Sequence, residues 1–163
     1  MPKKFKSMDG VFRVDPIYKN KLVGKFINCI MWDGKKSTAQ KIFYDALDEV
    51  KKQLPKDDPM DVFSKAIENV KPMVEVRSRR IGGANYRIPV EVTSKRQLSL
   101  ALRWIIISAR KKKGRPMYRK LANEFVMAFR GDKESEALKK KIEVHNEAES
   151  HKAFAHFAFF KGR

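Results

Sequence analysis

The feature that most constrains the fold is a change in the spacing of apolar residues near position 73. Before and after it, apolar side chains recur every three or four residues, which is typical of amphipathic helices. Over residues 73–92 they instead alternate with polar residues, in two runs separated by Gly82 and Gly83. Alternation on both sides of a Gly-Gly pair predicts a β-hairpin. We therefore expect a mainly α-helical chain with one two-stranded ribbon at residues 73–92.

The helical spacing predicts a bundle of about six helices around this ribbon. They are expected over residues 18–31, 37–54, 59–70, 94–113, 116–129 and 132–157. Ser37 and Ser94 each stand three residues before a glutamine, so each is expected to cap its helix in a capping box. Pro59 suits the first position of a helix. Asp132 is expected to cap the last helix.

The length of 163 residues suits a single domain. We expect a basic N-terminal arm at residues 1–14, a helical domain at residues 15–157 and a C-terminal extension at residues 158–163. No apolar run is long enough to span a bilayer or to act as a secretory signal, so a cytoplasmic location and no membrane partner are expected. The single cysteine, Cys29, excludes an internal disulfide and is expected to lie in the core.

The positive charge of the chain is concentrated in its middle. Residues 71–120 carry fifteen Lys or Arg against two carboxylates, Glu75 and Glu91, which is +13 of a formal net charge of +18. Such a field attracts polyanions, and phosphate backbones are the commonest of these. A charged surface kept only for solubility would need a smaller excess. The charge therefore favours a nucleic-acid partner.

A ridge of arginines is expected along the helix that begins near Ser94. Arg96, Arg103 and Arg110 are seven residues apart, so they lie on one side of a helix. The ridge ends in a basic run made of Arg110, Lys111, Lys112, Lys113 and Arg115. The helix dipole explains only one or two cations in a last turn, so the excess predicts phosphate contacts.

The sequence Gly34-Lys35-Lys36 precedes another expected helix and is a second candidate phosphate site. The N-terminus of a helix offers free backbone amides to an anion, and the two lysines add charge. A P-loop is not expected, because Cys29 stands where that motif requires its first glycine.

The ribbon is a third candidate site for nucleic acid. Two strands alone are marginally stable in water, so the ribbon is expected to project and meet a partner. Its cationic residues are Arg77, Arg79, Arg80 and Arg87. Gly82 and Gly83 allow a close approach to a sugar-phosphate backbone, and Tyr86 can stack on a base. The alternative is an ordinary hairpin whose arginines lie over its own core.

Catalysis, a cofactor and a metal site find little support in the sequence. His145, His151 and His156 do not share one helix face, and no nucleophile or metal-ligand motif is present. Four aromatic residues within positions 153–160 predict either contacts with RNA or a neighbouring protein, or an additional core layer. The main alternatives to an RNA-binding protein are an architectural DNA-binding protein and, less favoured, a nucleic-acid enzyme.

Several blocks of sequence carry a resemblance to a known family. They are Asn20-x-Leu22-x3-Phe26-Ile27-x6-Gly34-Lys35-Lys36-x5-Ile42-Phe43-x2-Ala46, then Arg79-Arg80-Ile81-Gly82-Gly83-x-x-Tyr86-x-Ile88-Pro89-Val90-Glu91-Val92, and the shorter Ala101-Leu102-Arg103-Trp104, Ala109-Arg110-Lys111 and Ala153-Phe154-Ala155-His156-Phe157. Together they resemble the small-subunit ribosomal protein 7 family in its bacterial and organellar form. The resemblance covers residues 15–157.

The resemblance implies a helical bundle with a protruding hairpin, in a primary binder of small-subunit ribosomal RNA (rRNA) that nucleates assembly of the head. It implies that rRNA contacts the basic arm with Lys3, Lys4 and Lys6, the Gly34-Lys35-Lys36 turn, and the basic helix ending at Lys113. It also implies a ribbon beside the exit-site tRNA and the mRNA path, near the ninth and eleventh small-subunit proteins. A bacterial and an organelle-encoded ribosome are both compatible with it. Glu147 and His151 depart from the usual Met and Asn of the family, and residues 158–163 extend past its common end.

Overall fold

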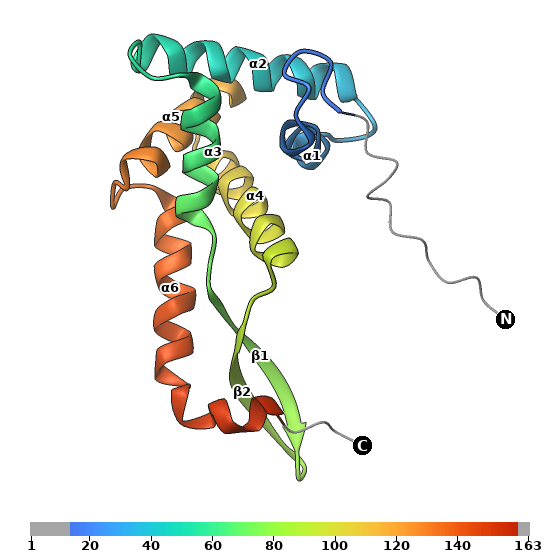
Figure 1. Cartoon of the computed structure of the whole chain (residues 1–163), viewed down its shortest axis with the longest axis vertical. Helices are drawn as coiled ribbons and strands as arrows, with labels where there is room; N and C mark the ends of the chain where they lie inside the picture. The colour runs from blue at the N-terminus through green and yellow to red at the C-terminus, as the bar shows by residue number, and fades with distance from the viewer. Residues whose placement is uncertain (1–13, 160–163) are drawn as a thin grey trace, which may run out of the picture.

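The computed structural model describes residues 14–159 (Figure 1). Within this range the chain forms six α-helices, one pair of strands and a C-terminal 3₁₀ helix, η2. The elements are α1 (Lys21–Ile30), α2 (Lys36–Gln53), α3 (Pro59–Val70), β1 (Val74–Ile81), β2 (Ala84–Glu91), α4 (Ser94–Lys111), α5 (Met117–Arg130), α6 (Glu136–Ser150) and η2 (Lys152–Phe159). The predicted helical bundle with one β-hairpin is confirmed. None of the helices in the described range is long and apolar enough to cross a membrane.

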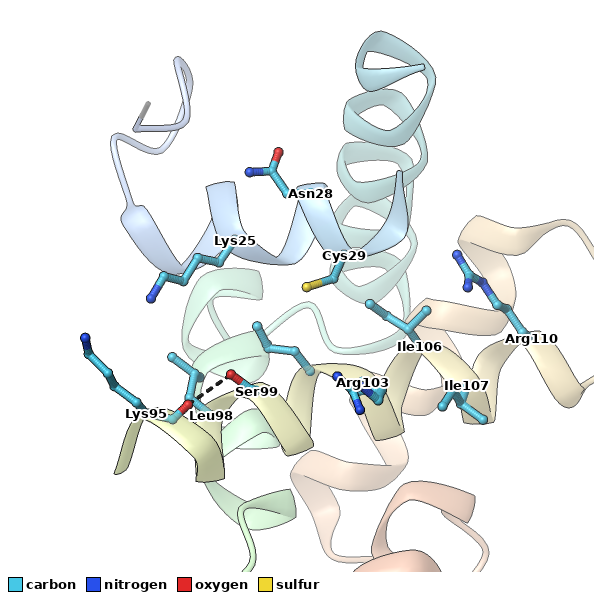
Figure 2. A pocket seen from close by; sticks show the side chains of 11 residues that line it. Lys25, Asn28, Cys29, Lys95, Leu98, Ser99, Arg103, Ile106, Ile107 and Arg110 are labelled. Carbon is cyan, nitrogen blue, oxygen red and sulfur yellow. Dashed lines mark hydrogen bonds between the residues drawn. The ribbon is translucent and has the colours of Figure 1, made fainter. Parts of the chain in front are cut away.

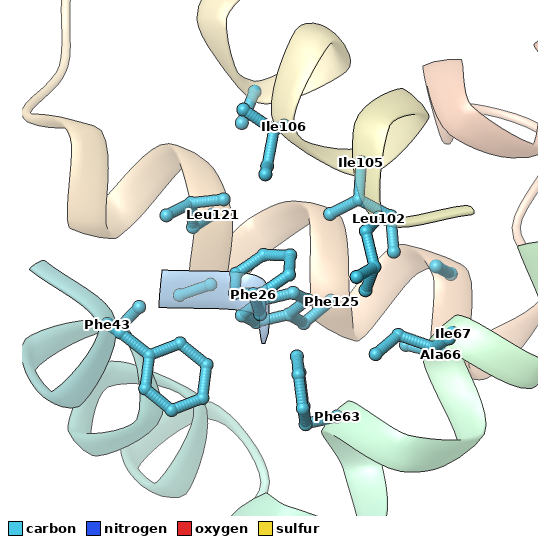
Figure 3. Packing of buried hydrophobic residues seen from close by; sticks show 14 of the residues in the cluster. Phe26, Phe43, Phe63, Ala66, Ile67, Leu102, Ile105, Ile106, Leu121 and Phe125 are labelled. Atoms are coloured by element: carbon cyan, nitrogen blue, oxygen red, sulfur yellow. The ribbon is translucent and has the colours of Figure 1, made fainter. Parts of the chain in front are cut away.

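Four phenylalanines form the centre of the core. Phe26 of α1, Phe43 of α2, Phe63 of α3 and Phe125 of α5 are fully buried. The centroids of their contacting rings lie 5.2–5.6 Å apart, in tilted and edge-to-face arrangements that aromatic rings favour (Figure 3). Each ring belongs to the apolar stripe of its own helix, so the core forms where four amphipathic faces meet.

The helix starts differ from two of the predictions. α2 has Lys35 at its N-cap and α4 has Thr93, and neither residue makes a side-chain capping hydrogen bond. Ser37 and Ser94 already lie inside the first turn, so neither can act as the cap and both predicted capping boxes are wrong. Pro59 occupies the first turn of α3 as predicted.

The ribbon lies within the predicted residues 73–92. β1 and β2 pair in antiparallel register from Val74 opposite Glu91 to Ile81 opposite Ala84. Gly82 and Gly83 join them with φ angles of 56° and 89°. Two consecutive positive φ angles are typical of a type I′ turn, whose twist matches the strands and lets them pair right up to it.

The sequence predicted a single helix over residues 132–157, and this prediction is wrong. The structure has two elements there, α6 and η2. α6 begins after Ser135, whose Oγ accepts a hydrogen bond from the Leu138 amide at 3.3 Å. The chain then turns at His151, and η2 crosses the ribbon near its far end (Figure 1). The turn brings Phe154 and Phe157 onto Tyr86, with ring centroids 5.5 Å and 5.3 Å from it. These two rings therefore add an apolar layer within the protein.

The ribbon is also held along its length by α6. The Met73 amide at the base of the ribbon donates to Nε2 of His145, at 3.1 Å. Further along, Arg87 forms an ion pair with Glu147, also at 3.1 Å. The ribbon projects from the bundle, but α6 and η2 support one side of it.

Two residues near the N-terminus differ in their exposure, and one of them contradicts a prediction. Cys29 was expected in the core but is exposed. The buried face of α1 carries Phe26, Ile27 and Ile30, and Cys29 lies outside that face. Asp15 is buried, and its carboxylate accepts hydrogen bonds from the amide of Tyr18 at 2.9 Å and the hydroxyl of Tyr44 at 2.6 Å. These hydrogen bonds tie the segment before α1 to α2.

Candidate nucleic-acid interface

A groove between α1 and α4 collects cationic side chains from both helices (Figure 2). Its volume is about 610 Å³, and Lys25, Lys95, Arg103 and Arg110 line it together with apolar residues of α4. Cys29 points into this α1–α4 groove. Although Cys29 is exposed, the surrounding groove partly desolvates its thiol and raises the pKa, whereas the positive charges of Arg103 and Lys25 act in the opposite direction. The groove therefore combines an apolar floor with a positive electrostatic field.

Arg110 connects the α1–α4 groove to a second one, which we call the Trp32 groove. This second groove has a volume of about 400 Å³, and Trp32, Lys35 and Arg110 are among its lining residues. The Arg110 guanidinium lies 4.9 Å from the centroid of the Trp32 ring and donates to the Ile30 carbonyl at 3.1 Å. The structure thus brings the Gly34-Lys35-Lys36 turn and the end of the arginine ridge together.

The Gly34-Lys35-Lys36 turn has the backbone that a tight connection requires. Gly34 adopts a φ of 71°, which glycine tolerates without a steric cost. The Lys35 amide closes the turn by donating to the Trp32 carbonyl at 2.9 Å. α2 begins immediately afterwards, with no acidic residue in its first turn. The positive end of its helix dipole can therefore attract an anion, although the Lys36 amide already donates to the Gly34 carbonyl.

The three arginines of the ridge have different environments. Arg96 forms an ion pair with Glu75 at 2.6 Å. Arg103 is exposed and borders two grooves, of which the first is the α1–α4 groove. The second groove lies between α4 and α6, has a volume of about 420 Å³ and is lined by Lys111 among others. Lys111, Lys113 and Arg115 are exposed as well. Arg103 and these neighbours are the best placed of the basic residues on and just after α4 for a phosphate backbone.

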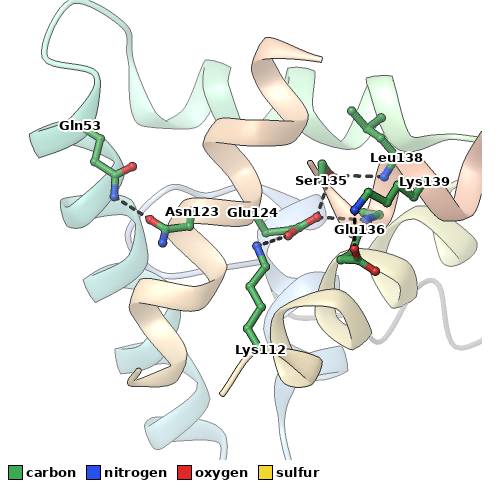
Figure 4. Close-up of polar contacts among 9 residues, drawn as sticks. Gln53, Lys112, Asn123, Glu124, Ser135, Glu136, Leu138 and Lys139 are labelled. Carbon is green, nitrogen blue, oxygen red and sulfur yellow. Dashed lines mark hydrogen bonds and ion pairs between the residues drawn. The ribbon is translucent and has the colours of Figure 1, made fainter. Parts of the chain in front are cut away.

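Lys112 takes part in a polar network that links three helices (Figure 4). Its ammonium pairs with the fully buried carboxylate of Glu124 at 2.6 Å. The other oxygen of Glu124 accepts from the Ser135 hydroxyl at 2.7 Å and the Ala137 amide at 3.0 Å. This network joins the end of α4 to α5 and to the start of α6. Glu124 was not predicted from the sequence to be buried, although its place on the inward face of α5 beside Phe125 is a signal of burial.

The ribbon carries its cations in two different settings. At its base, Glu75 is buried and pairs with both Arg77 and Arg96, which joins β1 to α4. At its tip, Arg79, Arg80 and the two turn glycines are exposed. Tyr86 does not present a free ring for base stacking, because Phe154 and Phe157 pack against it.

The paired Glu75 predicts a pH-dependent contribution to stability. Burial alone would raise the pKa of its carboxyl, but hydrogen bonds from Arg96 and Arg77 hold that pKa below its ordinary value of 4.5. A lowered pKa stabilises the folded state above the pKa of the unfolded chain, and the gain is lost as the pH falls through the folded value. Unfolding free energies of the parent protein and Glu75→Gln should therefore differ at pH 7 and converge below about pH 4.5.

A matched control for this measurement is Glu91→Gln, because Glu91 is exposed on the other strand of the ribbon. It should change the unfolding free energy little at any pH. A difference between the parent and Glu75→Gln that stays constant from pH 7 to pH 3 would contradict the assigned role of the carboxylate. These measurements follow denaturant unfolding at each pH.

The arrangement as a whole suits binding of a polyanion. Within residues 14–159, no three His, Cys, Asp or Glu side chains gather in a way that could hold a metal ion. Lys3, Lys4 and Lys6 of the expected basic arm lie outside the described residues.

Comparison with known proteins identifies the family. The model of the family described as ribosomal protein S7p/S5e matches residues 2–152, which include α1–α6 and the ribbon. A small ribosomal subunit protein uS7 from Thermotoga petrophila is 53% identical over 143 residues, covering 88% of this chain and 90% of the relative. The proteins of the same name from Rhodopirellula baltica and a Nitratiruptor species are 51% identical over 146 residues (89% and 92% covered) and 54% identical over 143 residues (88% and 90% covered). The chain belongs to the ribosomal protein S7p/S5e family.

Proposed function

We propose that the chain is a structural component of the small ribosomal subunit that binds small-subunit rRNA directly and nucleates folding of the head. The observation that carries this proposal is the positively charged α1–α4 groove, which Arg110 connects to the Trp32 groove, where Lys35 lies. Relatives with about half of their residues identical bear the name of a small-subunit protein. Members of this ribosomal family are structural proteins and not enzymes, so the chain is not an enzyme.

The binding mechanism is neutralisation of RNA phosphates by fixed cations. Lys and Arg side chains release counterions from the backbone, so affinity falls steeply as salt rises. The bases of a folded RNA helix lie in a deep major groove, so a protein reads mainly shape and phosphate positions. Helices α1 and α4 both pack into the hydrophobic core, which sets the relative positions of the charges they carry.

The ribbon has a second part in the proposal. We assign it to the region of the exit-site tRNA and the mRNA path, with the ninth and eleventh small-subunit proteins as neighbours. Support comes from the exposed Arg79 and Arg80 at its tip and from the bracing by α6 and η2, which holds the tip away from the bundle. A supported cationic projection suits transient contacts with tRNA and mRNA.

The proposal is tested by chemical footprinting of the purified protein on small-subunit rRNA. Protection is expected in the head domain and is expected to weaken as salt rises, because phosphate contacts dominate the affinity. Duplex DNA at the same salt is the competitor. If DNA displaces the rRNA at equal concentration, or if the head domain shows no protection, the proposed function is wrong.

A further inference from the structure

Trp32 stands out because it is a large aromatic residue in an exposed position. It exposes 66% of its surface, in the turn between α1 and α2. Two residues of this turn adopt a left-handed backbone conformation, Asp33 with a φ of 51° and Gly34 with a φ of 71°. A single exposed apolar side chain is common and needs no function by itself. The surroundings of Trp32, however, are those of a binding site.

One face of the indole is covered by an oriented cation. The Arg110 guanidinium lies 4.9 Å from the ring centroid, within the range of a cation–π interaction. Its hydrogen bond to the Ile30 carbonyl, at 3.1 Å, fixes the guanidinium in place. Because Arg110 covers one side of the ring, the large exposed area of Trp32 must include much of the opposite side. The ring is thus a supported flat surface that faces solvent.

The groove next to this ring has the size and chemistry for a flat anionic ligand. Its volume of about 400 Å³ falls in the range of small-ligand sites. Ile42 and Met117 give it apolar walls, and Lys35 stands at the N-terminus of α2. A nucleotide needs an aromatic platform for its base and a cation for its phosphate. Trp32 can supply the platform, and Arg110 and Lys35 can supply the charge.

We propose that Trp32 stacks on one unpaired nucleobase of the bound RNA, while Arg110 and Lys35 contact the adjoining phosphates. This inference rests on the proposed rRNA-binding function and identifies a single-stranded element, such as a bulge or a loop, as the part of the RNA held there. A base inside a duplex is already stacked on both sides, so the occupant is an unstacked base. Because Arg110 lines both grooves, one RNA strand can pass from the α1–α4 groove onto the ring.

The test compares Trp32→Ala and Trp32→Phe in binding to a transcript of the rRNA head domain. Losing one base stack should weaken binding about tenfold in Trp32→Ala. The salt slope should not change, because no charge is removed. Trp32→Phe keeps an aromatic ring and should lose at most about threefold. Ile142→Ala is the matched control, since Ile142 is a 51% exposed apolar residue on α6 and its loss should leave affinity unchanged.

A fluorescence measurement reports on the ring directly. In a Trp104→Phe background Trp32 is the remaining tryptophan, and a single-stranded oligoadenylate should quench its emission while duplex RNA should not. Trp32→Ala with parental rRNA affinity, together with no quenching, would overturn the stacking inference and leave the proposed function intact. Absence of rRNA binding by the parent protein would instead defeat the proposed function, and quenching by oligoadenylate would then decide separately whether the ring stacks on bases.

Discussion

Replacing Phe26 with alanine should lower the free energy of unfolding by about 3–5 kcal/mol, because the change leaves a cavity at the centre of the core. Phe26 is fully buried, and its ring contacts Phe43, Phe63 and Phe125. The substitution therefore removes the contacts of α1 with one ring each on α2, α3 and α5. A typical domain is stable by only about 5–15 kcal/mol, and the variant should therefore be close to unfolding at physiological temperature. Denaturant unfolding followed by circular dichroism measures the loss.

The control for this variant is Ile142→Ala, which removes an exposed apolar side chain from α6. Its effect should stay within about 0.5 kcal/mol, as is usual at surface positions. A loss below about 1 kcal/mol for Phe26→Ala would mean that the four rings are not the main packing contact of the core.

Reversing two charges on α4, Arg103→Glu together with Lys111→Glu, should weaken binding to small-subunit rRNA by about a hundredfold or more. Each lost charge-assisted contact contributes about 1.5 kcal/mol or more. The slope of log affinity against log salt should fall by about two, one for each phosphate contact removed. Both side chains are exposed, so the fold should survive the change. Filter binding at a series of salt concentrations measures both quantities.

The matched variant for this experiment alters the tip of the ribbon, with Arg79→Ala and Arg80→Ala. It should keep rRNA affinity within about threefold and should reduce contact with tRNA at the exit site. Equal loss of rRNA affinity in both variants would refute the division of roles between α4 and the ribbon. Lys112 is left unchanged because its removal would strand the buried carboxylate of Glu124 and destabilise the domain.

The helices and the ribbon were largely predictable because their signals are local. An apolar stripe such as that of α2, with Phe43 and Leu47, must be buried whatever covers it. The turn at Gly82 and Gly83 is predictable for the same reason, because glycine readily adopts the two positive φ angles that a type I′ turn requires. The helix starts were less predictable, since Ser37 and Ser94 satisfy a capping pattern that the actual first turns do not use.

The parts that sequence reasoning missed depend on residues far apart in the chain. Arg96 and Glu75 are 21 residues apart, and Lys112 and Glu124 are 12 apart, so no periodicity links them. The break between α6 and η2 follows from packing on Tyr86, which comes long before it in the sequence. The same limit applies to the candidate site. The charge of the α4 ridge was evident, whereas a lone aromatic such as Trp32 forms no pattern.

The aromatic core also has a consequence for the order of events during synthesis. Phe26 and Phe125 touch each other across about a hundred residues of chain. At about 5–20 residues per second, α1 waits roughly 5–20 s for α5 to be made. In that time Phe26, Phe43 and Phe63 of the first three helices can already contact one another, but Phe125 joins them only when α5 has been made. The ribbon gains its support later still, because α6 and η2, which pack against it, are translated after α5.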